Sequence, residues 1–248
     1  MSQEPQNAIL QIDGKEIELP ILVGTDGLKA VDVSKLYDTH RIMTYDPSLG
    51  STSVCQSTIT YVDGDEGILR YRGIPIEQFD RPNPNFIEAA WLLIFGSLPT
   101  LVELKEFRDR LTSHELLHEG LREQFGQLPP KSPPMAILSA MFNQLACYHE
   151  KFLPLDDDEL FVEAATRLIS KARTIAAYAY RRSKGLPFIY PDPALRYCAN
   201  FLHILFSIPY QQYIIGPEIE DAMNLVLILH ADHEQNCSTS TVRTVGSA

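Results

Sequence analysis

The sequence lacks long apolar runs, and this excludes a protein that spans a membrane by helices. Its longest apolar stretches, near residues 89–95 and 225–229, are far shorter than the roughly 20 residues that a membrane helix needs. The first residues, Met1 to Pro5, also lack the basic start and apolar stretch of a secretory signal. We therefore expect a cytoplasmic protein with no membrane partner.

Cysteine is scarce as well, and its spacing excludes the common metal and redox motifs. The four cysteines are Cys55, Cys147, Cys198 and Cys237, with no C-x-x-C pair among them. Cys147 and Cys198 fall within apolar helical patterns, so we expect both to be small buried hydrophobic residues.

Basic residues are too few for a nucleic-acid-binding protein. The chain has 21 Lys and Arg against 32 Asp and Glu, a formal net charge of −11. Proteins that bind nucleic acid need a basic surface to displace counterions from phosphate. A small anionic ligand is still compatible with this charge, because a local cluster of donors can outweigh a distant net charge.

The first part of the sequence predicts two β-hairpins. Strands at 9–12 and 17–19 flank the turn Asp13-Gly14. Strands at 57–62 and 68–72 flank a glycine-containing acidic loop at 63–67. That loop lacks the ligand spacing and closing glutamate of an EF-hand, so no metal site is expected there.

After Pro84 the pattern becomes helical. Apolar spacing, caps and breakers predict helices at 85–95, 100–113, from about 132, from 156–159 to Gly185, 194–206 and 217–233. The 248 residues are enough for one large domain or a domain and a half. We predict a mainly α protein, with a β segment and hairpin at 1–80 and a helical domain at 81–248.

The segment around residues 229–243 carries the most chemistry. In the preceding helix, the apolar stripe Ile219, Ala222, Met223 and Val226 continues at helical spacing to His230 and His233. This period predicts that both imidazoles point inward. Residues 236–240 offer N-caps for a new helix near Thr241, and its free backbone N–H groups would suit a carboxylate beside His233.

Three interpretations of this segment remain open on the residues alone. The histidines can be ordinary core residues with satisfied hydrogen bonds. They can ligate zinc with Asp232 or Glu234, although those carboxylates fall on other helix faces and the H-E-x-x-H order is absent. The third interpretation is a site for a small anionic substrate.

Several stretches resemble the bacterial, hexameric-type citrate synthases. They are residues 227–243, 59–73, 167–171 and 185–191, and the likeness extends over the chain from about Ile9. The resemblance implies a multi-helical large domain, here truncated at its C-terminus. It implies an acyltransferase that condenses acetyl-CoA with oxaloacetate and water to give citrate and CoA, the first step of the tricarboxylic acid cycle. It further implies a homodimer or larger homo-oligomer, with acetyl-CoA as a substrate and with no cofactor or metal.

Residue by residue, the resemblance places part of the oxaloacetate site here. His233 matches the histidine that hydrogen-bonds oxaloacetate, Asn236 and Ser238 match positions lining the same pocket, and His230 matches a more structural position. The family's catalytic histidines and aspartate base are expected downstream of Ala248. We therefore expect no catalytic residue in this N-terminal fragment and no activity from it alone.

A possible allosteric nucleotide site is also implied, because some members of the family are inhibited by NADH. Arg167 and Lys171 lie one helical turn apart and face the same way. With Tyr148 and His114 they match positions of that site, and the alternative is an ordinary solvated basic face.

Departures from the pattern at this site predict weak or absent inhibition by NADH. They are Ser113, Glu115 and Tyr210, and a carboxylate at position 115 would repel a phosphate.

Two other functions remain open on the sequence. A 2-methylcitrate synthase shares the fold and the oxaloacetate pocket but uses propionyl-CoA. A non-catalytic helical scaffold would keep the fold without the chemistry.

Overall fold

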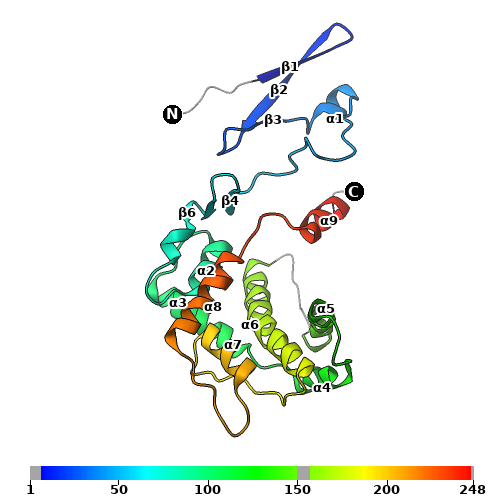
Figure 1. The fold of residues 1–248 in the computed structure, drawn as a ribbon. Coiled ribbons are helices and arrows are strands. Elements are labelled where there is room, and N and C mark those ends of the chain that lie inside the picture. Colours follow the sequence, from blue (N-terminus) through cyan, green and yellow to red (C-terminus); the bar gives the residue numbers. More distant parts are fainter. Residues whose placement is uncertain (1–6, 150–156, 247–248) are drawn as a thin grey trace. The chain divides into compact units, whose positions relative to one another are not determined.

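A computed structural model describes residues 7–149 and 157–246 of the chain. These residues pack as two compact units, 1–57 and 58–248 (Figure 1). The second predicted hairpin therefore packs in the same unit as the helices. The predicted domain boundary between residues 80 and 81 stays a prediction.

The first unit is a small antiparallel sheet with one short helix. Strands β1 (Asn7–Ile12), β2 (Lys15–Val23) and β3 (Lys29–Val31) pair in that order. Asp13 and Gly14 both have positive φ angles, 50° and 73°, as a two-residue hairpin turn requires. The first predicted hairpin is thus confirmed. The sequence analysis did not predict β3 or α1 (Leu36–His40), whose Leu36 packs on β2.

The second unit begins with the other predicted hairpin, which is confirmed with shorter strands. Strands β4 (Thr60–Asp63) and β5 (Ile68–Tyr71) pair antiparallel, followed by β6 (Ile74–Pro75) and the 3-10 helix η1 (Ile76–Phe79). In the loop, the Asp63 carboxylate accepts hydrogen bonds from the backbone N–H groups of Asp65 and Glu66. This acid therefore closes the turn.

Helices α2 (Phe86–Phe95) and α3 (Leu101–Ser113) begin where their capping residues predicted. The Asn85 side chain accepts from the N–H of Ile87, and Thr100 forms a capping box with Glu103. Gly96 ends α2 with a φ of 86°, a conformation that glycine adopts without strain.

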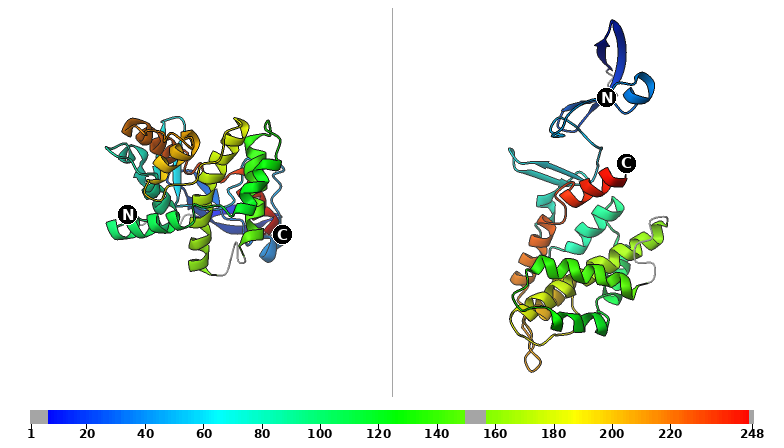
Figure 2. Two further views of the ribbon diagram at one scale, coloured as in Figure 1. Left: turned by 90° about the horizontal axis from the view of Figure 1, so that it is seen from below. Right: turned by 90° about the vertical axis from the view of Figure 1, so that its right-hand side faces the viewer.

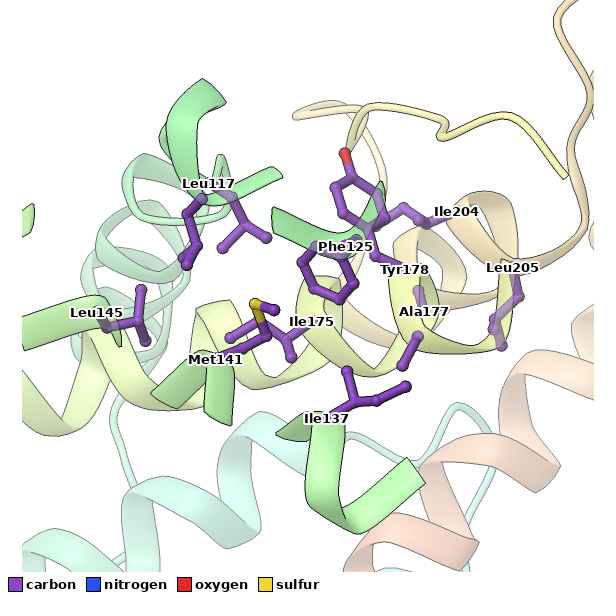
Figure 3. Close-up of a cluster of buried hydrophobic side chains, with 12 residues drawn as sticks. Leu117, Phe125, Ile137, Met141, Leu145, Ile175, Ala177, Tyr178, Ile204 and Leu205 are labelled. Carbon is purple, nitrogen blue, oxygen red and sulfur yellow. The ribbon is translucent and has the colours of Figure 1, made fainter. Parts of the chain in front are cut away.

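The long helix α6 (Asp158–Ser183) packs against α3, α4 (Glu119–Gln127), α5 (Pro134–Leu145) and α7 (Tyr197–Phe206) (Figures 1 and 2). Helix α6 begins within the acidic run, as predicted, and Asp157 caps it. Figure 3 shows the core between these helices, in which Phe125 lies beside Tyr178, and Met141 beside Ile175. The mainly α prediction is confirmed. None of the helices in the described ranges is long and apolar enough to span a membrane.

Three helical details differ from the predictions. Helix α7 begins at Tyr197 rather than Ala194, because the N–H groups of Ala194 and Leu195 bond to Asp192 in a turn. Helix α8 (Pro217–Leu229) ends four residues before His233, and α9 (Cys237–Gly246) begins four residues before Thr241. Cys198 is buried as expected, whereas Cys147 is exposed in the 3-10 turn η2 (Ala146–Tyr148) after α5.

Candidate functional site

The end of helix α8 is set by a tyrosine from the hairpin. Tyr71 on β5 is fully buried, and its hydroxyl donates to the carbonyl oxygen of Ile228 at 2.8 Å. The N–H of Asp232 lies 3.4 Å from the same hydroxyl oxygen. In a continuing α-helix that N–H would bond directly to the carbonyl of Ile228. The carbonyl of Ile228 instead accepts from the tyrosine hydroxyl and, at 3.2 Å, from the N–H of Ala231, and the helix ends at Leu229.

A second contact joins the hairpin to the segment after α8. The Thr60 hydroxyl on β4 donates to the Asp232 carboxylate. Ala231 packs against a buried cluster that contains Tyr71, Phe79 and Ile228. Two hydrogen-bonding side chains and a patch of core therefore hold the start of the 230–236 segment in place.

The prediction that both histidines point inward is wrong. His230 and His233 are exposed, with their rings 5.7 Å apart. The predicted stripe is also mainly outside, since Ile219, Ala222 and Val226 are exposed and Met223 is half-buried.

A polar face of α8 turns inward instead. Its buried residues are Glu220, Asn224 and Ile228. The Asn224 side chain accepts from the N–H of Phe86 at 2.9 Å, and Glu220 pairs with Arg196 at 2.8 Å. Apolar periodicity predicts the wrong face here, because two of the three buried residues on this face are polar.

The three predicted oxaloacetate residues lie in one short stretch at the start of α9. The Asn236 side chain accepts from the N–H of Thr239 at 2.8 Å and so caps the helix. Ser238 follows in the first turn, and both residues are exposed. His233 lies three residues before Asn236, and Glu234 between them has a φ of 64°. Such a helix start offers N–H donors to a carboxylate.

The predicted nucleotide-site residues come together in a second cluster. His114 Nε2 lies 2.5 Å from Glu163 Oε1, and Arg167 Nη2 lies 3.6 Å from the same oxygen. Lys171 donates to the carbonyls of His114 and Leu116 at 3.1 and 2.6 Å.

Tyr148 contacts His118, and its sequence neighbour His149 lies near the cations of this cluster. The Tyr148 ring stacks at 4.5 Å on that of His118. Burial lowers the pKa of its neighbour His149, and the nearby positive charges of Arg167 and Lys171 lower it further.

The cluster is not an ordinary solvated basic face, because Lys171 is only 5% exposed. Burial, and then the charge of Arg167, lower the pKa of Lys171 to about 8. Burial and the charge of Arg167 both disfavour the protonated form of Lys171. A nearby anion would favour that form.

The prediction that Glu115 repels anions at this cluster is wrong. Its side chain is buried and pairs with Arg173 at 2.9 Å, and it also accepts from Asn200 at 3.0 Å. Burial raises the pKa of Glu115, and Arg173 partly offsets that rise. The carboxylate that does face the cations is Glu163. It lies one helical turn before Arg167, a spacing that the sequence analysis could have used.

Across residues 7–149 and 157–246, no three His, Cys, Asp or Glu side chains are grouped so that they could hold an ion. The zinc interpretation of His230 and His233 therefore lacks a third ligand among the described residues.

The family model described as "Citrate synthase, C-terminal domain" matches residues 48–248 of the chain. The chain belongs to the citrate synthase family. It is 44% identical over 250 residues to citrate synthase 1 of Mycobacterium tuberculosis, and 43% identical over 249 residues to the citrate synthase of Corynebacterium glutamicum. Both alignments cover 100% of this chain but only 57% and 56% of those proteins.

Solved citrate synthases have the same fold. The Thermoplasma acidophilum enzyme, in a ternary complex with carboxymethyl coenzyme A and oxaloacetate, matches with a TM-score of 0.71 at 28% identity, over 82% of this chain and 53% of that one. The Pyrobaculum aerophilum enzyme matches with a TM-score of 0.67 at 30% identity, over 94% and 52%. This chain therefore corresponds to about half of a citrate synthase.

Proposed function

We propose that the protein containing this chain has citrate synthase activity. It is an acyltransferase that condenses acetyl-CoA with oxaloacetate and water, releasing citrate and CoA, as in the first step of the tricarboxylic acid cycle. Membership of the family supports the reaction class. The observation that carries the proposal is the anchored 230–238 segment, in which His233 lies three residues before Asn236, the residue that caps α9.

His233 is the proposed hydrogen-bond donor to oxaloacetate, with Asn236 and Ser238 lining the same pocket. The capping bond uses the Asn236 carbonyl oxygen, which leaves its amide N–H groups for a substrate oxygen. The exposed start of α9 supplies backbone donors for a carboxylate. Together these groups suit a small keto-diacid.

The chemical step needs groups beyond these. Removing a proton from the acetyl-CoA methyl group requires a positioned base and stabilisation of the enolate. His233 alone cannot supply both, so the catalytic groups are proposed to lie outside residues 1–248. The reaction as proposed uses acetyl-CoA as a substrate and needs no cofactor.

We expect a thiol-release assay to distinguish the full-length protein from the 248-residue chain. A chain extended to the length of its relatives should release CoA thiol only when acetyl-CoA and oxaloacetate are both present. The 248-residue chain should release none above background. Turnover by the shorter chain would contradict the placement of the catalytic groups. An inactive full-length protein would favour the scaffold alternative, and faster turnover of propionyl-CoA would indicate a 2-methylcitrate synthase.

The exposed apolar residues of α8 and α9 support assembly into a homodimer or larger homo-oligomer. Ile219, Val226 and Leu229 on α8 are 45–49% exposed, and Val242 and Val245 on α9 are 71–72% exposed. Clustered exposed apolar side chains are usually covered, here by the rest of the polypeptide or by a second copy of it. The cytoplasm is the proposed location, in line with the sequence expectation.

We also propose that NADH inhibits this protein weakly or not at all. Glu163 occupies the position that an anion would take between His114 and Arg167. A phosphate would have to displace or approach that carboxylate, which repels it.

Millimolar NADH should therefore leave the activity of the full-length protein nearly unchanged. Glu163→Gln should make the protein more sensitive to NADH, because it removes the competing charge. Glu159→Gln, one turn earlier on the same helix and exposed, is the matched control and should behave as wild type. Inhibition of the wild type by micromolar NADH would contradict the proposal.

A further inference from the structure

The contacts between the hairpin and the 230–236 segment indicate that Tyr71 does more than fill the core. We propose that Tyr71, assisted by Thr60, is a positioning residue for the substrate-binding His233. This inference rests on the proposed function. Neither hairpin residue touches the substrate; both act through the backbone and side chain of Asp232.

The Tyr71 hydroxyl contacts the backbone at the end of α8. It donates to the carbonyl of Ile228 at 2.8 Å and lies 3.4 Å from the N–H of Asp232, so it competes with the helical bond between these two groups. The carbonyl of Ile228 also accepts from the N–H of Ala231 at 3.2 Å, as in a last helical turn that tightens. A tyrosine hydroxyl is protonated at neutral pH, and burial raises the pKa of Tyr71 further, so the hydroxyl is a donor. The chain therefore leaves α8 before His233.

The residues on either side of His233 are held by contacts that begin at the hairpin. The Asp232 carboxylate accepts from Thr60 and lies 3.4 Å from the N–H of Glu234. Glu234 then takes a left-handed conformation, with a φ of 64°, and the chain continues into α9. His233 is thus flanked by one residue anchored to the hairpin and another oriented by that anchor.

Without the tyrosine hydroxyl, the N–H of Asp232 and the carbonyl of Ile228 are free to pair with each other. That bond would extend α8 by residues that now form the turn, and it would rotate the His233 side chain away from the start of α9. Loss of the hydroxyl should therefore weaken the binding of oxaloacetate more than it slows the chemical step.

Steady-state kinetics of Tyr71→Phe in the full-length protein test this inference. We expect KM for oxaloacetate to rise about fivefold, the equivalent of one hydrogen bond, with kcat and KM for acetyl-CoA nearly unchanged. Tyr197→Phe is the matched control. It removes a hydroxyl that donates to the carbonyl of Ile169 on α6, also at 2.8 Å, and should lower the melting temperature without raising KM for oxaloacetate.

The hydroxyl of Thr60 provides a second test if Tyr71→Phe does not fold. Thr60→Val should raise KM for oxaloacetate, and Thr60→Ser, which keeps the hydroxyl, should restore it. A KM for oxaloacetate that is unchanged in Tyr71→Phe, or equally raised in Tyr197→Phe, would overturn the inference. So would equal values for Thr60→Val and Thr60→Ser. A wild-type protein without activity would instead refute the proposed function.

Discussion

Replacing His233 by alanine in the full-length protein should lower kcat/KM for oxaloacetate about a hundredfold, the upper range for a hydrogen bond to a charged group. The imidazole is exposed, so its removal should leave the fold intact. The loss then reports substrate recognition rather than stability. Initial rates measured at varied oxaloacetate concentration give this quantity directly.

His230 provides the matched control for that substitution. It is the same residue type, it is also exposed, and its ring lies 5.7 Å from that of His233. Its Nδ1, however, lies 2.7 Å from the carbonyl oxygen of Val226 in α8, the helix that ends just before His230. His230→Ala should therefore change kcat/KM by only about twofold, as for an ordinary surface substitution. Equal losses in the two variants would contradict the assignment of His233.

Replacing Arg181 by methionine should lower the free energy of unfolding by about 3 kcal/mol or more, the cost of leaving buried polar groups without their partner. Arg181 is fully buried at the end of α6. Its Nη1 donates to the carbonyls of Ile204, Leu205 and Ser207 at 2.8–3.0 Å. Its Nε donates to Pro187 at 2.5 Å.

These bonds satisfy the carbonyl end of α7, and no methionine atom can donate to them. Urea unfolding of the full-length variant should show the lower midpoint. Lys184→Met is the control, since Lys184 is an exposed cation just after the same helix and should cost less than about 0.5 kcal/mol. Equal midpoints for the two variants would contradict the structural role of Arg181.

Much of the helical fold could be predicted because its signals are local. Asn85, Thr100 and Asp157 each cap the helix that follows them, and each is visible in a few residues of sequence. Helix α4 was missed because it lacks such signals. It is short, it contains Gly120 and Gly126, and His118 caps it.

The candidate site was only partly predictable, because its geometry depends on contacts distant in sequence. Helical spacing extended α8 to His233, whereas Tyr71, 157 residues before Ile228, ends it. The direction of the Glu115 side chain likewise depends on Arg173 and Asn200, which lie 58 and 85 residues away. No local pattern encodes such partners. The family resemblance identified the 230–238 segment, and the structure shows which contacts end α8 before it.

The central claim is that the 230–238 segment binds oxaloacetate through His233, and calorimetric titration in the absence of any acyl-CoA tests it most directly. We predict saturable binding of oxaloacetate to the full-length wild type and to His230→Ala, and affinity about a hundredfold weaker in His233→Ala. Equal affinity of the wild type and His233→Ala for oxaloacetate would contradict the claim.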